Sequence, residues 1–106
     1  MELEMATDFV AESMERGLHL IPQHMQGAIK RYILNGIPPG NFLSALLQND
    51  FMAAVGRADE DNAAALKGWA MFFYNYIPSG SYGSPDAYAA WISKGGHLGS
   101  QQAAAQ

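Results

Sequence analysis

The segment from Leu66 to Tyr76 constrains the fold most, because its residues are apolar on nearly every side of a helix. Acids at 59–61 indicate the start of this helix, where the helix dipole favours negative charge, and Pro78 indicates its end. We expect one helix from about Glu60 to Tyr76, either central in the fold or facing a second copy of the chain. The residues expected on this core or oligomer face are Leu66, Trp69, Phe72, Phe73 and Tyr76.

Two helices are expected in the N-terminal third of the chain. A loose apolar stripe over 3–17 predicts the first, with Gly17 as the left-handed residue that ends it. Apolar residues at helical spacing over 25–33 predict the second. Asn35-Gly36 is expected to stop that helix, and the Pro-Pro-Gly at 38–40 prevents it from resuming.

Capping residues indicate the remaining helices. Asn41 is the expected N-cap of a third, short helix, and Asp50 caps a further turn over 51–55 unless the helix runs on with a bend. Ser84, followed by Pro85 and an acid, predicts a fifth helix, which Gly95-Gly96 ends. We find no alternating pattern long enough to predict a strand.

The length and composition indicate one domain. The chain has 106 residues, of which 49% are hydrophobic, as in ordinary globular proteins. We predict an all-α fold, a compact bundle of four to five short helices over residues 1–96. The small and polar segment 97–106 is expected to be a flexible tail or to be ordered by a partner.

Charge is scarce and unevenly distributed. Charged residues make up 15% of the chain, against about 25% in an average domain, so either part of the surface is covered by another chain or the protein is a merely Ala- and Gly-rich monomer. Residues 1–17 carry five acids against Arg16, a charge of −4 that equals the net charge of the whole chain. The body is therefore close to neutral, and no basic patch indicates nucleic-acid binding.

Several classes of site find no matching pattern. His19, His24 and His97 lack the spacing and the cysteine partners of a zinc site, and the acids at 59–61 fail the calcium-loop pattern. There is no phosphate-binding glycine motif and no nucleophile elbow. We therefore expect a protein that is not an enzyme and uses no metal or cofactor. The absence of cysteine is compatible with a reducing cytoplasm, and no apolar run is long enough to cross a membrane.

A set of polar residues flanked by apolar ones is the candidate binding site. One interpretation is a structural network of helix caps and an Arg57 ion pair with Asp50 or Asp59. The other is a pocket in which guanidinium groups hold an anion while an aromatic ring stacks on a planar ligand. The break at 56–59 is then either part of the site or a hinge. The members are Arg31, Tyr32, Asn49, Asp50, Arg57, Asp59 and Asn62.

Residues 21–92 resemble a set of small proteins encoded by bacteriophages and prophages. The pieces that carry the resemblance are the run 24–32, Gly36-Ile37-Pro38-Pro39-Gly40-Asn41-Phe42-Leu43, Asn49-Asp50, Gly56-Arg57-Ala58-Asp59 with Asn62, Gly83-Ser84-Pro85 and Trp91. The resemblance implies a phage origin and a place in the cytoplasm of a bacterial host. By analogy, small phage proteins of this kind act on host machinery or host defence.

Three hypotheses about function follow. The first is a non-enzymatic phage accessory protein that binds and inhibits a host protein, such as a defence component. The second is an oligomeric sponge for a nucleotide-like signal, held by Arg31, Arg57 and aromatic rings. The third is a minor structural or assembly protein of the virion. In each case we expect a homo-oligomer, with a dimer as the first expectation.

Overall fold

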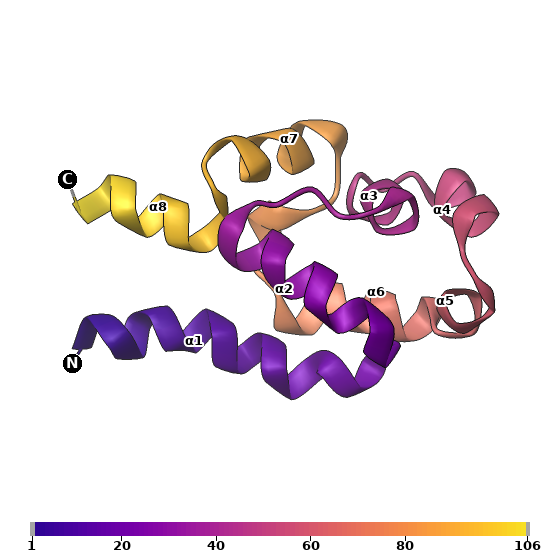
Figure 1. Ribbon diagram of the computed structural model, residues 1–106, viewed down its shortest axis with the longest axis horizontal. Helices are drawn as coiled ribbons and strands as arrows, with labels where there is room; N and C mark the ends of the chain where they lie inside the picture. Colours follow the sequence, from indigo (N-terminus) through magenta and orange to yellow (C-terminus); the bar gives the residue numbers. More distant parts are fainter. Residues whose placement is uncertain (1, 106) are drawn as a thin grey trace.

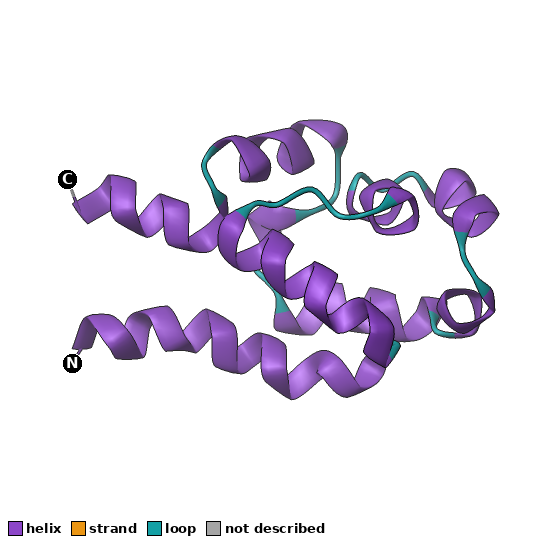
Figure 2. Ribbon diagram, viewed as in Figure 1, coloured by secondary structure: helices purple, strands orange, loops and turns teal. Residues whose placement is uncertain are grey.

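Helices are the only regular elements over the part of the chain that the structure describes. The computed structural model describes the backbone of residues 2–105 and the side chains of residues 9–102. The all-α class predicted from the sequence is confirmed, and Figure 2 shows helices joined by short loops. The elements are α1 (Glu2–Gly17), η1 (Leu18–Leu20), η2 (Gln23–Met25), α2 (Gln26–Asn35), α3 (Asn41–Leu47), α4 (Phe51–Arg57), α5 (Glu60–Ala64), α6 (Leu66–Tyr76), η3 (Ser79–Ser81), α7 (Pro85–Ser93) and α8 (Gly96–Ala105), where η marks a 3-10 helix.

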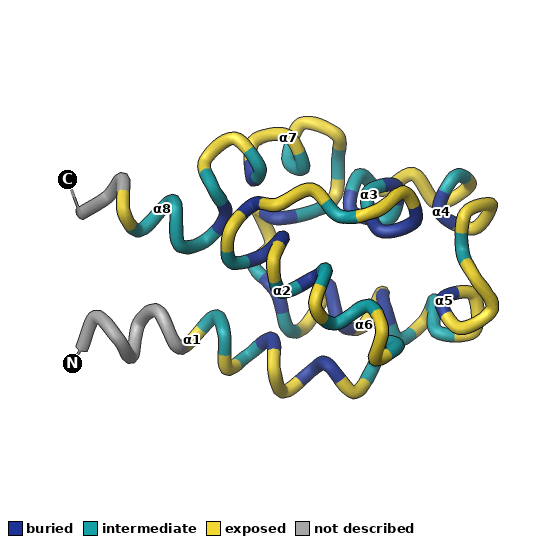
Figure 3. Tube along the Cα trace, viewed as in Figure 1, coloured by how far each residue is buried: buried dark blue, intermediate teal, exposed yellow. Residues whose placement is uncertain are grey.

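The helices enclose one core. In Figure 1, α1 runs along one edge of the molecule, α3, α4 and α7 lie along the opposite edge, and α2 crosses between them. Helix α6 packs against α1, α3 packs against α4, and α8 packs against α2. Figure 3 places buried segments of α2, α3 and α6 toward the middle of the molecule. The apolar surface that each helix buries there is what stabilises the fold.

Trp69 lies at the centre of this core. Its side chain is fully buried and makes edge-to-face contacts with Phe42 and Phe73, both with ring centroids 5.9 Å away, and with Phe72 at 6.3 Å. Phe72 and Phe73 are buried as well, whereas Leu66 and Tyr76, the other residues expected on this face, are half-buried. Helix α6 is therefore central.

The single helix expected from Glu60 to Tyr76 is divided into α5 and α6. Ala65 separates the two, with φ −100° and ψ 13°. Its N–H is shared between the carbonyl oxygens of Asp61 at 3.1 Å and Asn62 at 3.2 Å, a three-centre arrangement typical of helix ends. The expected end of the helix before Pro78 is confirmed.

Two expectations about the ends of helices are wrong. Gly17 is not left-handed, since its φ is −98°. Glycine is required there for a steric reason: a Cβ would lie 2.5 Å from the ring of Tyr76 and 2.9 Å from that of Phe72. Asn41 is the first residue of α3 rather than its N-cap, and Gly40 holds the cap position without a side-chain bond. At Gly17, packing against residues that are distant in sequence determines the role of the glycine. At Asn41, the helix begins one residue earlier than the capping pattern predicts.

Three other caps are confirmed. The side chains of Asp50, Asp59 and Ser84 accept hydrogen bonds from the third residue after each, at 3.2, 2.7 and 3.0 Å. Asp50 therefore starts a separate helix, α4, rather than standing at a bend. These bonds satisfy backbone donors that the first turn of a helix leaves free.

Glycine contacts join helices that are far apart in sequence. Gly36, left-handed at φ 68°, ends α2, and Gly96 begins α8 at φ 69°. A Cβ on Gly96 would lie 2.5 Å from the backbone nitrogen of Gly36, so the two backbones pack directly. Most of the segment expected as a tail belongs to helix α8, which packs against α2.

A second close backbone contact joins α6 to η1. A Cβ on Gly68 of α6 would clash with the carbonyl oxygen of Leu20.

Candidate functional site

The polar residues singled out in the sequence have separate structural environments. Arg31 is exposed on α2, and Arg57, exposed at the end of α4, donates to the carbonyl oxygen of Asn41 at 3.4 Å. Asn49 forms the turn after α3 in the left-handed region, at φ 65°, which asparagine tolerates better than most residues. Asp50 and Asp59 are the caps described above.

Two members of the set belong to the core. Tyr32 is fully buried; its hydroxyl donates to the carbonyl oxygen of Ser81 at 2.7 Å, and its ring stacks on Tyr88 at 5.6 Å. Burial, together with the neighbouring Tyr88, raises the pKa of Tyr32 above its ordinary value. Asn62 is buried and accepts a hydrogen bond from Nε1 of Trp69 at 3.1 Å. Both side chains are therefore held by the fold rather than presented to a ligand.

The expected ion pair of Arg57 is not formed. Among residues 9–102 the ion pairs are Lys30 with Glu15 at 2.7 Å and His24 with Asp59 at 3.0 Å. The N–H of Asn62 holds the pKa of the Asp59 carboxyl below its usual value, and His24 lowers it further. The candidate residues therefore cap helices, form a turn or pack in the core, and they do not come together in one binding site.

An apolar groove between α4 and α6 is the better candidate. It has a volume of about 350 Å³ and no charged side chain in its lining. Residues of α3, of α4 and of the turn between them line the groove together with residues of α6. The segment 82–83 lies between these two sides, since Gly83 donates to the carbonyl oxygen of Leu47 and the ring of Tyr82 packs on Phe73. Its lining consists of Leu46, Asn49, Phe51, Leu66, Ala70, Phe73, Tyr74, Tyr82 and Gly83.

Helix α4 carries its large apolar side chains on the outside. Phe51, Met52 and Val55 are 60%, 79% and 41% exposed, whereas Ala54 is fully buried and Ala53 half-buried. A helix that merely covers the core shows the opposite pattern, with its large apolar residues inside. Because Phe51 also lines the groove, the exposed face of α4 and the groove form one surface.

Helix α6 contributes to the same surface. Tyr74, which lines the groove, is 80% exposed, and Met71, one turn away, is 42% exposed. Of the seven large hydrophobic residues that are exposed in the described part of the chain, five lie on α4 or α6. Concentrated apolar exposure of this kind is typical of an interaction site.

The sequence contains a signal for this site that helical periodicity does not reveal. In the run 51–55, two bulky residues precede two alanines and a valine. A helix that turns its alanines toward the core must therefore expose Phe51 and Met52. Nothing local says which face turns inward, because the packing of α4 on α3 decides it.

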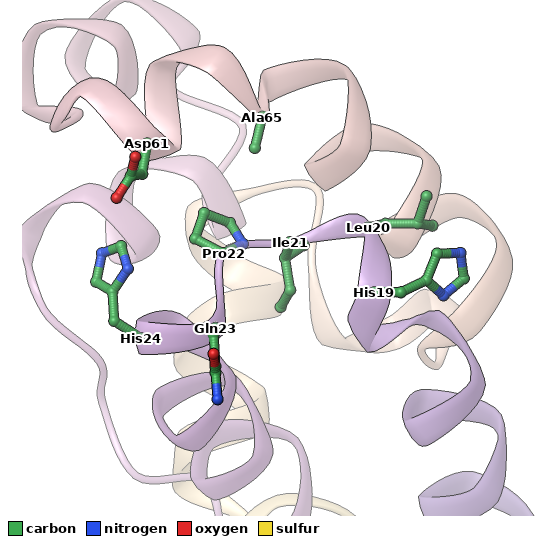
Figure 4. A pocket seen from close by; sticks show the side chains of 8 residues that line it. All are labelled: His19, Leu20, Ile21, Pro22, Gln23, His24, Asp61 and Ala65. Carbon is green, nitrogen blue, oxygen red and sulfur yellow. The ribbon is translucent and has the colours of Figure 1, made fainter.

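A second hollow lies at the turn between α1 and α2. Its lining comes from residues 19–24 together with Asp61 and Ala65, and its volume is about 700 Å³. Figure 4 shows His24 and Asp61 directed toward one another, while His19 lies at the far end and points away. Within residues 9–102 no three His, Cys, Asp or Glu side chains gather in a way that could hold a metal ion.

His97 provides a test of pH dependence. Its Nε2 atom is buried without a hydrogen-bond partner, and burial, together with the positive charge of Lys94, lowers the pKa of His97. The unfolded chain then binds this proton more readily than the folded protein. The free energy of unfolding should accordingly fall as the pH drops below about 6.5, the ordinary histidine pKa.

The measurement is urea unfolding at several pH values for the wild type and for His97→Gln. Since His19 and His24 are present in both proteins, the difference isolates His97. We expect the variant to lose part of the pH dependence between about pH 7 and pH 5. Identical pH profiles would show that His97 titrates in the folded protein as it does in the unfolded chain.

Comparisons with other proteins give no family. Models of protein families, curated proteins and solved structures were all searched, and nothing matched the chain. None of the helices over the described residues combines the length and the apolar character that crossing a bilayer would require.

Proposed function

We propose that this protein is a non-enzymatic binding protein that takes an apolar segment of a partner protein into the groove between α4 and α6. The observation that carries the proposal is the inverted arrangement of α4, with alanines inside and Phe51, Met52 and Val55 exposed. Burial of a large apolar side chain contributes about 1.5–3 kcal/mol, so such a surface favours association when a complementary one is available. Aromatic and methionine side chains are also enriched at protein interfaces.

The chemistry of the groove favours a protein over a nucleotide. Its lining contains no charged side chain, and neither Arg31 nor Arg57 belongs to it. A phosphate needs a positive group or several free N–H donors, which an apolar hollow does not concentrate. An apolar side chain from a helix or loop suits the hollow better, with Asn49 and Tyr82 as polar groups that orient it.

The proposed target is a protein of a bacterial host, such as a component of its defence. This part of the proposal depends on the resemblance of residues 21–92 to small phage proteins. Binding alone is sufficient for inhibition when the covered surface is the one that the host protein uses.

The test is affinity capture from a bacterial host lysate with the wild type and with Phe51→Asp/Tyr74→Lys. Both substitutions suit their helices, since an acid is favoured in the first turn of α4 and a cation in the last turn of α6. We expect the wild type to retain a host protein in stoichiometric amount and the double variant to lose it.

The matched control is Ile37→Asp, which places a charge at another exposed apolar residue, 47% exposed and not part of the groove. It should capture the host protein as well as the wild type does. Equal capture by the groove variant and the wild type would refute the proposed site, and the absence of any stoichiometric host protein would refute the proposed function.

A further inference from the structure

We propose that in the free protein the groove is covered by a second copy of the chain, so that a two-fold dimer holds the binding surface closed until a partner competes for it. This inference rests on the proposed function, because it concerns the regulation of the same groove. It predicts that the monomer is the binding-competent form and that the dimer is the closed one.

Projecting side chains and a hollow lie on the same surface. Met52 and Tyr74 are the most exposed of its large hydrophobic residues, at 79% and 80%, and Tyr74 borders the hollow itself. In a two-fold interface the same patch is used by both copies, so each copy must supply both the projection and the cavity. A surface that carries both can be covered by a second copy of itself.

The absence of charge in the lining permits this self-association. A charge near a two-fold axis faces its own copy and is repelled, which makes charged patches poor isologous interfaces. None of the nine residues that line the groove is charged. The long acidic stretch of the chain lies in α1, and no residue of α1 lines the groove.

Opposite charges flank the groove. Asp50 is the chain neighbour of Phe51 and Lys67 that of Leu66, two residues that line the groove, and both charged side chains are exposed. Neither takes part in the ion pairs formed among residues 9–102. In a two-fold arrangement, Asp50 of one copy can face Lys67 of the other, and the reciprocal pair forms by symmetry. The rim is thus complementary to itself in charge while the centre is apolar.

Analytical ultracentrifugation of the purified full chain, without any partner, tests the dimer. We expect the mass to rise with concentration from the 11.5 kDa of the single chain toward twice that value. Phe51→Asp should raise the dimer dissociation constant by about thirty-fold or more, as for a central interface residue, and Ile37→Asp should leave it unchanged. A single chain mass at all concentrations would overturn the proposal, as would a dimer that Phe51→Asp leaves intact.

Charge exchange tests the orientation. Lys67→Asp should weaken the dimer, and Asp50→Lys/Lys67→Asp should restore it, even though the second variant loses the N-cap of α4. Circular dichroism of each variant establishes that it is folded. Failure of the double variant to recover would refute the reciprocal pairing.

The outcomes also separate this inference from the proposed function. A monomer that still captures a host protein through the groove contradicts the closed dimer only. A dimer whose groove variants capture as the wild type does contradicts the proposed function only. If both proposals hold, capture per chain should increase when the protein is diluted below its dimer dissociation constant.

Discussion

Replacing Gly68 with alanine is expected to lower the free energy of unfolding by about 3 kcal/mol or more, the upper range for an overpacked site. The added Cβ would clash with the carbonyl oxygen of Leu20, which belongs to the backbone and cannot rotate away. Helix α6 and η1 would have to separate, and the packing around Trp69 would change with them. Urea unfolding followed by circular dichroism measures the effect.

Gly56→Ala is the matched control for this prediction. Gly56 also lies within a helix, but nothing stands within 4 Å of the position that its Cβ would occupy. Alanine is favoured over glycine inside a helix by about 0.5–1 kcal/mol, so this variant should be slightly more stable than the wild type. Equal urea midpoints for the two alanine variants would contradict the close contact at Gly68.

Trp69→Ala is expected to cost about 3–5 kcal/mol, the range for removing a buried aromatic side chain. The substitution removes three aromatic contacts and leaves Oδ1 of the buried Asn62 without its donor. Since small domains are stable by only about 5–15 kcal/mol, this loss is a large fraction of the free energy of unfolding. Thermal unfolding by calorimetry measures the loss.

Tyr74→Ala separates this effect from the mere loss of an aromatic ring. Tyr74 lies on the same helix but is 80% exposed, so its removal should change the free energy of unfolding by at most about 0.5 kcal/mol. It should nevertheless weaken association through the groove. A loss for Tyr74→Ala as large as that for Trp69→Ala would contradict the exposed position of Tyr74.

The sequence predicts those parts of the fold that depend on neighbouring residues. The caps at Asp50, Asp59 and Ser84 are recognisable because the donor that each satisfies is three residues away. Gly17 and Gly68 are different, since what makes each necessary is the approach of a segment that is distant along the chain. Periodicity alone therefore assigns the wrong role to Gly17 and gives no role to Gly68.

The candidate site was harder to predict than the fold. Polar residues in apolar surroundings predict a pocket, but Tyr32 and Asn62 are buried, with their polar atoms bonded to Ser81 and Trp69. The groove, in contrast, consists of residues that look like ordinary core in the sequence. Whether Phe51 turns inward or outward depends on how α4 packs on α3, and no local pattern contains that information.

The ends of the molecule bear on how the chain can be joined to other proteins. Along the 42 Å axis, the first turns of α1 and the last turns of α8 lie at one end and α4 lies at the other (Figure 1). A domain fused to either terminus, or a solid support joined to a terminus by a linker, would lie at the opposite end of the molecule from α4. Immobilisation through a terminal tag should therefore not cover this face.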